Sequence, residues 1–78
     1  MPIFRKRSEP VEARQWNGDS DEFRRWLGYA FVTVWADGML IQNRDGRVVA
    51  RQGDWIVMDG GFYTVEPAVF AAEYEAAT

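Results

Sequence analysis

Two Asp-Gly pairs, Asp37-Gly38 and Asp45-Gly46, constrain the fold more than any other feature of the sequence. Each pair lies between short segments whose apolar residues recur at every second position, as they do in half-buried strands. Tight hairpin turns favour Asp-Gly, because both residues accept a positive φ at little cost. Residues 30–36, 38–43 and 47–52 are therefore predicted to form a three-stranded antiparallel meander.

Turn residues also divide the rest of the chain into short strands. Residues 11–16 are compatible with a first strand. Residues 55–59 and 62–66 resemble a fourth and a fifth strand after the meander. Glycine permits positive φ and aspartate accepts hydrogen bonds from nearby amides, so the pair Gly53-Asp54 is expected to turn the chain before residue 55. The pair Gly60-Gly61 is expected to form the tight turn between the last two strands.

Two short helices complete the predicted fold, which we assign to the α+β class. The segment 19–28 has Asp19 as its expected N-cap, Glu22 in a capping box and Gly28 as its end. Pro67 suits the first turn of a short C-terminal helix. We expect a curled, barrel-like antiparallel meander of about five to six strands, with one helix after the first strand and one at the C-terminus.

A chain of 78 residues is expected to form one domain, and we assign it to residues 10–78. Residues 1–9, with Arg5, Lys6 and Arg7, are expected to be a polar N-terminal arm. Aromatic residues make up 15% of the chain, which allows a dense core for its size. A homo-oligomer is a further way for so small a domain to gain stability.

Composition argues against several functions. The chain contains no cysteine and no histidine, so we predict no disulfide, no metal site, no cofactor and no enzyme activity. Asp54 and Asp59 are five residues apart in a strand segment, so their carboxylates are expected on opposite faces rather than in a catalytic pair. The net charge of −3 argues against nucleic-acid binding. Because no apolar run reaches the roughly 20 residues of a membrane span, we expect no membrane association and a cytoplasmic location.

Pairing across the two hairpins sorts the meander into two faces. The predicted core face contains small and aliphatic side chains: Val32, Val34, Ala36, Met39, Ile41, Val48 and Ala50. The opposite face mixes apolar and polar side chains: Phe31, Thr33, Trp35, Leu40, Gln42, Arg47, Val49 and Arg51. Either the chain's own helices and first strand or a partner subunit is expected to cover this mixed face. If a partner covers it, the candidate interface residues are Phe31, Trp35, Leu40, Arg47, Val49 and Arg51.

A second candidate site rests on two aromatic residues. Trp55 and Tyr63 could stack a base or another planar ligand beside Arg47 or Arg51, although such rings more often belong to a core or an interface. This arrangement would suit a protein that binds or sequesters a nucleotide-like molecule.

The order of several residues resembles a family of small proteins encoded by tailed bacteriophages, whose central motif is Pro-Gly-Asp-Trp/Tyr-Ile. The matching positions are Pro10, Val11, Trp16, Gly18, Gly53, Asp54, Trp55, Ile56, Phe62, Tyr63, Pro67, Phe70 and Tyr74. Gln52 departs from the family, which often has proline there. The resemblance implies a phage origin and action in the infected bacterial cytoplasm, but no catalytic residue, because family members share no agreed activity.

These features favour a non-enzymatic phage accessory protein that acts by binding. We expect it to be a homo-oligomer, with a host protein as another candidate partner. The alternative function is binding of a nucleotide-like small molecule, and a role as a minor virion component is the third.

Overall fold

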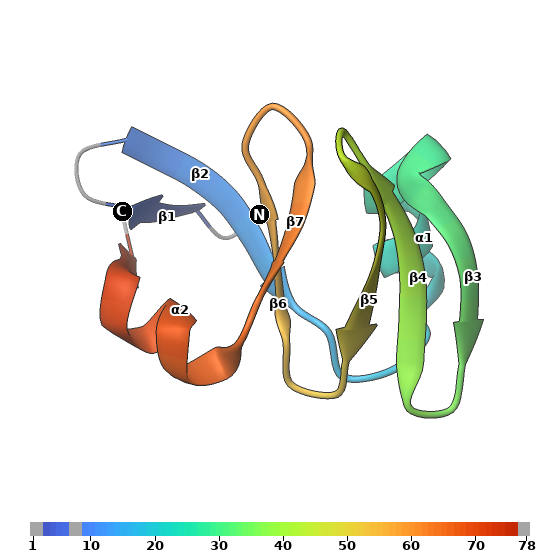
Figure 1. Ribbon diagram of the computed structural model, residues 1–78. Coiled ribbons are helices and arrows are strands. Elements are labelled where there is room, and N and C mark those ends of the chain that lie inside the picture. The colour runs from blue at the N-terminus through green and yellow to red at the C-terminus, as the bar shows by residue number, and fades with distance from the viewer. Residues whose placement is uncertain (1–2, 7–8, 77–78) are drawn as a thin grey trace.

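The computed structural model describes residues 3–6 and 9–76, which form an α+β fold (Figure 1). The strands are β1 (Ile3–Lys6), β2 (Glu9–Gln15), β3 (Phe31–Trp35), β4 (Gly38–Asn43), β5 (Gly46–Arg51), β6 (Trp55–Met58), β7 (Phe62–Val65) and β8 (Tyr74–Ala76). The helices are α1 (Asp21–Leu27) and α2 (Pro67–Glu73), with a 3-10 turn, η1 (Gly28–Ala30), after α1. Both predicted helices are therefore present, one after a strand near the N-terminus and one near the C-terminus.

The described strands form two antiparallel sheets rather than one continuous meander. The larger sheet has five strands in the order β7-β6-β2-β1-β8, and the smaller has three in the order β3-β4-β5. Figure 1 shows α1 behind the three-stranded sheet and α2 below β1 and β2. The three-stranded meander is confirmed. The two described sheets do not close into a barrel, so the barrel-like part of the prediction is wrong.

The turn at Gly53-Asp54 explains why β6 leaves the meander. The Gly53 N–H donates to the Trp16 carbonyl at 2.9 Å, and the Trp16 N–H donates to the Asp54 carbonyl at 2.8 Å. These two bonds join the turn to the end of β2. As a result β6 pairs with β2, with Gln15 opposite Trp55, instead of pairing with β5.

The N-terminal segment also differs from the expectation of a polar arm. Within residues 1–9, β1 occupies 3–6 and pairs with both β2 and β8, and β2 already begins at Glu9. A four-residue strand is stable only beside other strands, and here it has one on each side. Because β8 comes from the other end of the chain, no local pattern could indicate this pairing. Residues 1, 2, 7 and 8, including Arg7, lie outside the described residues.

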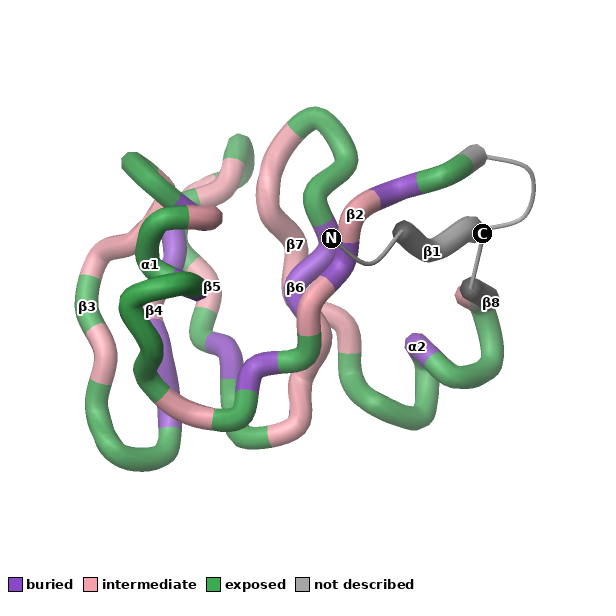
Figure 2. The backbone as a smooth tube through the Cα atoms, turned by 180° about the vertical axis from the view of Figure 1, so that it is seen from behind, coloured by how far each residue is buried: buried purple, intermediate pink, exposed green. Residues whose placement is uncertain are grey.

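Buried side chains form two clusters on opposite sides of the five-stranded sheet. Figure 2 marks the buried residues along the backbone. The larger cluster joins both sheets to α1: Trp16, Phe23, Leu27, Met39, Ile41, Ala50 and Ile56. The smaller cluster joins the five-stranded sheet to α2: Val11, Ala13, Val57 and Phe70. Neighbouring strand residues such as Ile56 and Val57 face opposite sides of a sheet, which is how one strand contributes to both clusters.

Most of the predicted core face of the meander is confirmed. Met39 lies opposite Ala50 and Ile41 lies opposite Val48, as the Asn43–Gly46 turn predicted. The first hairpin differs, because its two turn residues are Ala36 and Asp37 rather than Asp37 and Gly38. Ala36 is therefore exposed in the turn and does not belong to the core face.

A β-bulge in β3 places two further residues, Phe31 and Val32, differently from the prediction. The pairing register shifts between Phe31 and Thr33, so that Phe31 lies opposite Ile41. A bulge inserts one extra residue and so reverses the facing of every side chain beyond it. Phe31 accordingly packs against the larger cluster, whereas Val32 is not one of the residues packed there.

Helix α1 begins one residue later than predicted. Its N-cap is Ser20, whose Oγ accepts a hydrogen bond from the Phe23 N–H at 3.1 Å. The predicted cap, Asp19, instead accepts hydrogen bonds from both Nε and Nη2 of Arg24, at 2.7 and 2.6 Å. Gly28 ends the helix with a φ of +58°, as predicted.

Candidate functional site

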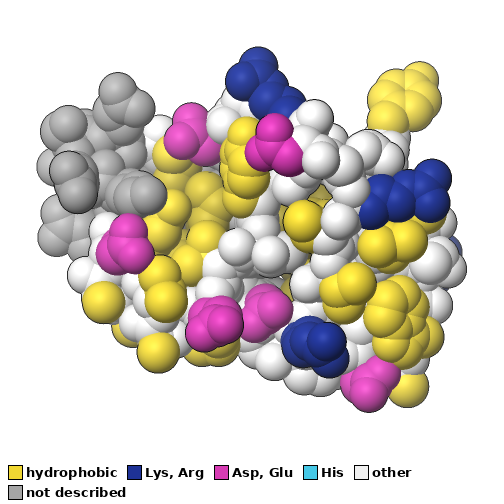
Figure 3. Space-filling view, in the orientation of Figure 1, with side chains coloured by type: hydrophobic (Ala, Val, Ile, Leu, Met, Phe, Trp, Pro, Cys, Tyr) yellow, Lys and Arg dark blue, Asp and Glu magenta, His cyan; other side chains and the backbone are white. Residues whose placement is uncertain are grey.

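The three-stranded sheet is covered on one face only. Helix α1 packs Phe23 and Leu27 against the face that carries Met39 and Ile41. We call the opposite side the open face, and its residues are Thr33, Trp35, Leu40, Gln42, Arg47, Val49 and Arg51. Figure 3 looks onto this side of the molecule and shows hydrophobic side chains over the three-stranded sheet, flanked by Lys or Arg side chains.

Apolar side chains of the open face reach solvent. Trp35 is 45% exposed and Val49 is 39% exposed. Leu40 lies between Thr33 and Val49 in one cross-strand row and is half-buried. No helix or strand covers these side chains in the described part of the chain, so intramolecular cover of the whole mixed face is not observed.

Trp35 has a fixed place on the open face because it lies over Gly38. These two residues are cross-strand partners, and a Cβ atom added to Gly38 would lie 2.6 Å from the indole ring. An aromatic ring that covers a glycine on the next strand replaces the side-chain packing that the glycine lacks. The indole therefore leaves one surface against the sheet and presents the rest to solvent.

Five of the six candidate interface residues lie on the open face, and the sixth does not. Trp35, Leu40, Arg47, Val49 and Arg51 are brought together there. Phe31 is placed instead among the half-buried side chains that pack on the core, because of the bulge described above. Sequence periodicity cannot reveal this exchange, since a bulge interrupts the alternation on which the assignment depends.

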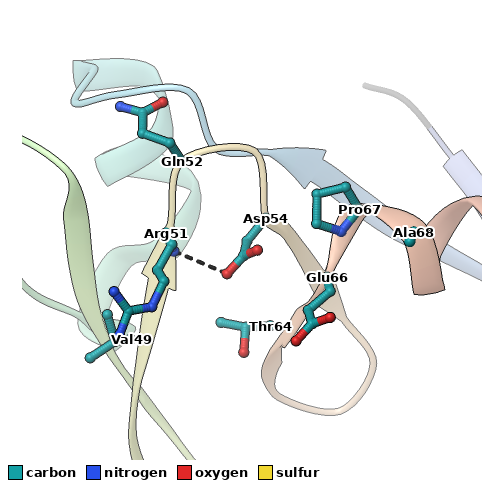
Figure 4. A pocket seen from close by; sticks show the side chains of 8 residues that line it. All are labelled: Val49, Arg51, Gln52, Asp54, Thr64, Glu66, Pro67 and Ala68. Carbon is teal, nitrogen blue, oxygen red and sulfur yellow. Dashed lines mark hydrogen bonds between the residues drawn. The ribbon is translucent and has the colours of Figure 1, made fainter.

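A groove of about 740 Å³ borders the open face, between β5 and the end of β7 (Figure 4). It is lined by Val49, Arg51, Gln52, Asp54, Thr64, Glu66, Pro67 and Ala68. Figure 4 shows the Arg51 and Glu66 side chains on opposite sides of Thr64. Neither of these two charged groups forms an ion pair with another described residue.

The turn residues hold one end of this groove. Gly53 has a φ of +87°, and the Asp54 carboxylate accepts a hydrogen bond from the Arg51 N–H at 3.0 Å. Gly60 has a φ of +69° in the turn between β6 and β7, whereas Gly61 does not have a positive φ. Asp54 thus has a structural bond within its own turn.

The two candidate stacking residues do not form one open platform. Trp55 stacks on Phe70 with ring centroids 3.9 Å apart and planes 2° from parallel, and Phe70 stacks in turn on Tyr74 at 4.6 Å. Tyr63 lies opposite Val57 in the β6–β7 ladder and is half-buried. One face of the Trp55 ring is therefore already covered by the chain itself.

Two features considered for chemistry in the sequence are an aspartate pair and a metal-binding cluster. Asp54 is bound in its turn and Asp59 is exposed in the β6–β7 turn, so the two carboxylates do not share a site. No group of three or more Asp, Glu, His or Cys side chains in the described ranges could hold a metal ion. The Asp19 carboxyl has a pKa below its ordinary value because Arg24 donates hydrogen bonds to it. This pair is exposed and lies at the start of α1.

Sequence reasoning missed the residues on the β7 side of the groove. Thr64 and Glu66 come 15 or more positions after Val49, and only the fold of the intervening β6–β7 hairpin brings them near β5. The one available signal was Glu66 directly before Pro67, which marks a strand end beside a helix start.

Comparison with known proteins does not assign the chain to a family. No family model matches it, and no significant match was found among curated proteins or solved structures. Within the described residues, none of the helices has the length and apolar character needed to cross a membrane.

Proposed function

We propose that this protein is a non-enzymatic binding protein that self-associates through its open face. The observation that carries the proposal is the exposure of Trp35 and Val49 on a sheet face that no described element covers. Tryptophan and arginine are the residue types that most often contribute large binding energies, and Arg47 and Arg51 flank these apolar side chains.

The size of the chain supports self-association. A domain of 78 residues buries a modest core, and pairing of two open faces would bury further apolar area. In a two-fold dimer each copy presents the same surface, so a face with central apolar and peripheral polar side chains suits such a contact. We therefore favour a homo-oligomer as the working form, with a host protein as the other candidate partner of the same face.

The resemblance to small tailed-phage proteins supports the biological setting that we propose. On this basis we propose a phage accessory factor that acts in the cytoplasm of an infected bacterium. Mass spectrometry of purified particles tests the third function, because a minor virion component would be present in them.

The test of self-association is sedimentation of the wild-type protein and of Trp35→Ala across a concentration series. We expect the substitution to weaken association by about 2–4 kcal/mol, the range of a tryptophan that anchors an interface. Met58→Ala is the matched control, since Met58 is 37% exposed on the other sheet. A wild type that stays monomeric at high micromolar concentration would contradict the proposal.

Binding of a small molecule is the alternative, and the groove between β5 and β7 is the observation in its favour. The groove is open to solvent, and its lining offers a ligand the Arg51 guanidinium and the Glu66 carboxylate. A ligand of this kind should raise the melting temperature in a nucleotide panel, because it binds the folded state only. Loss of that increase in an Arg51→Gln variant would locate the ligand in the groove.

A further inference from the structure

The indole of Trp35 lies with one ring face on the three-stranded sheet. A Cβ atom added to Gly38 would lie 2.6 Å from Cζ2, 2.7 Å from Cε2 and 2.9 Å from Nε1 of the indole. These three neighbouring ring atoms are nearly equidistant from that point, and a Cβ atom stands out from the plane of a sheet. The ring therefore meets β4 with its face rather than its edge. Its other face is turned outward, and Trp35 is 45% exposed.

The apolar centre of the open face follows the middle strand, β4. The indole covers Gly38, and Leu40 is the next residue of β4 on the same face. Leu40 has Thr33 of β3 on one side and Val49 of β5 on the other. We call the Trp35 indole and Leu40 together the β4 seam.

The charges of the open face lie on one side of the β4 seam. Arg47 and Arg51 both belong to β5, whereas the segment Phe31–Trp35 of β3 contains no charged residue. Neighbouring strands of a sheet are evenly spaced, so β3 and β5 lie at equal distances on either side of β4. A rotation that exchanges these two sides brings the charged strand of one copy opposite the uncharged strand of another.

This asymmetry selects one way of pairing two open faces. A two-fold axis along β4 places Arg47 and Arg51 opposite β3 of the second copy. An axis along β5 would instead place Arg51 opposite Arg51 of the second copy, and an axis across the strands at Leu40 would place it opposite Arg47 of the second copy. Like charges held opposite one another in a contact are strongly unfavourable, so the axis along β4 is favoured.

We propose that two copies of the chain stack their open faces about a two-fold axis along β4, with Trp35 on Trp35 and Leu40 on Leu40 of the second copy. This inference rests on the self-association proposed above and adds its geometry. Offset stacking of two indoles contributes beyond the apolar area that it buries. Packing of two sheets with their strands nearly aligned is a usual arrangement.

The first test is cross-linking through single cysteines, since the chain contains none of its own. Leu40→Cys is treated with a short bis-maleimide, and Met58→Cys, at a 37% exposed position on the other sheet, is the matched control. Thiols that face each other across the axis have a high effective concentration. We therefore expect about tenfold more cross-linked dimer from Leu40→Cys than from the control.

A mixture of two variants tests the direction of the axis. An axis along β4 brings Thr33 of one copy opposite Val49 of the other, because these residues flank Leu40 on opposite sides. Thr33→Cys mixed with Val49→Cys should give about fivefold more cross-linked dimer than either variant alone.

A spectroscopic measurement keeps the wild-type side chains in place. Two stacked indoles couple electronically, so the circular-dichroism spectrum should gain two bands of opposite sign as the protein associates. These bands should follow the same concentration dependence as sedimentation. Trp35→Leu should abolish them, while its leucine side chain still covers part of Gly38.

The outcomes separate this geometry from self-association itself. A wild type that sediments as a monomer at high micromolar concentration would overturn both. A wild type that sediments as a dimer, but lacks the paired bands or gives equal cross-linking for Leu40→Cys and Met58→Cys, would overturn the geometry alone. A dimer in which Thr33→Cys or Val49→Cys cross-links as well alone as in the mixture would also overturn the axis along β4.

Discussion

Single residues at turns and helix ends determine the local path of this chain. Gly53 takes a φ of +87°, and its N–H and the carbonyl of Asp54 both bond to the backbone of Trp16. Trp16 itself is fully buried in the larger cluster. One glycine thus connects a turn, the end of β2 and the core.

Replacing Gly53 with valine should lower the free energy of unfolding by about 1–3 kcal/mol, because a β-branched side chain is strained at positive φ. The cost comes from the backbone rather than from a clash, since an added Cβ would meet Pro67 at an ordinary 3.6 Å. Urea denaturation measures this loss in the free energy of unfolding. Gly61→Val is the control and should cost less, because Gly61 lacks a positive φ. Equal losses in the two variants would contradict the strain argument.

The contact between Asp19 and Arg24 at the start of α1 predicts that the stability of the protein depends on pH. Hydrogen bonds from Arg24 lower the pKa of Asp19 below its ordinary value of 3.8. Stability from this pair is therefore complete above the unfolded-state pKa and is lost as the pH falls through the lower folded-state value.

The measurement is the difference in unfolding free energy between the wild type and Asp19→Asn. The wild type should be the more stable at neutral pH, and the difference should fall toward zero at about pH 2. The effect should also shrink in high salt, because the pair is exposed. A difference that is constant with pH would show that the carboxylate charge is not its source.

At the scale of elements, α2 depends on stacked aromatic rings. Phe70 is 5% exposed and lies between Trp55 of β6 and Tyr74 of β8. Pro67 begins the helix at a position where no intrahelical N–H is needed. The helix has seven residues, too few for stability alone, so its packing on the smaller cluster maintains it.

Phe70→Ala should lower the free energy of unfolding by about 3–5 kcal/mol, as truncation of a buried phenylalanine commonly does. Thermal unfolding followed by circular dichroism measures the loss. Val69→Ala, at the neighbouring 41% exposed position, should have little effect. Similar losses in both variants would mean that the stack does not anchor the helix.

At the scale of the whole molecule, the larger cluster joins the two sheets, and the open face of the three-stranded sheet remains uncovered in the described part of the chain. The larger cluster fixes α1 against one side of the three-stranded sheet, so the open face is what remains for other molecules. Arg51 lies at its border, beside the groove.

Charge reversal at Arg51 should weaken self-association of the open face, and the loss should depend on salt. Exposed charges at an interface rim act through interactions that dissolved ions screen, whereas Trp35 acts through buried area. Sedimentation of Arg51→Glu at low and high ionic strength tests this. An effect that is the same at both ionic strengths would show that Arg51 contributes by packing instead.

Local chemistry was sufficient to predict much of the fold. Turn dipeptides located the three strands of the meander, Gly28 the end of α1 and Pro67 the start of α2. Alternation placed Met39, Ile41, Val48 and Ala50 on one face. These features depend on residues that are near one another in the chain, so they are visible in the sequence.

Contacts between distant segments determined the features of the fold that local patterns did not predict. Strand β6 joins β2 and not β5 because hydrogen bonds between the Gly53-Asp54 turn and Trp16 redirect the chain. The bulge in β3 moves Phe31 onto the core, and the β6–β7 hairpin brings Glu66 near Arg51 across the groove. Each of these outcomes depends on contacts between distant segments, whose entropic cost is offset only when the whole core forms, and no local pattern contains that information.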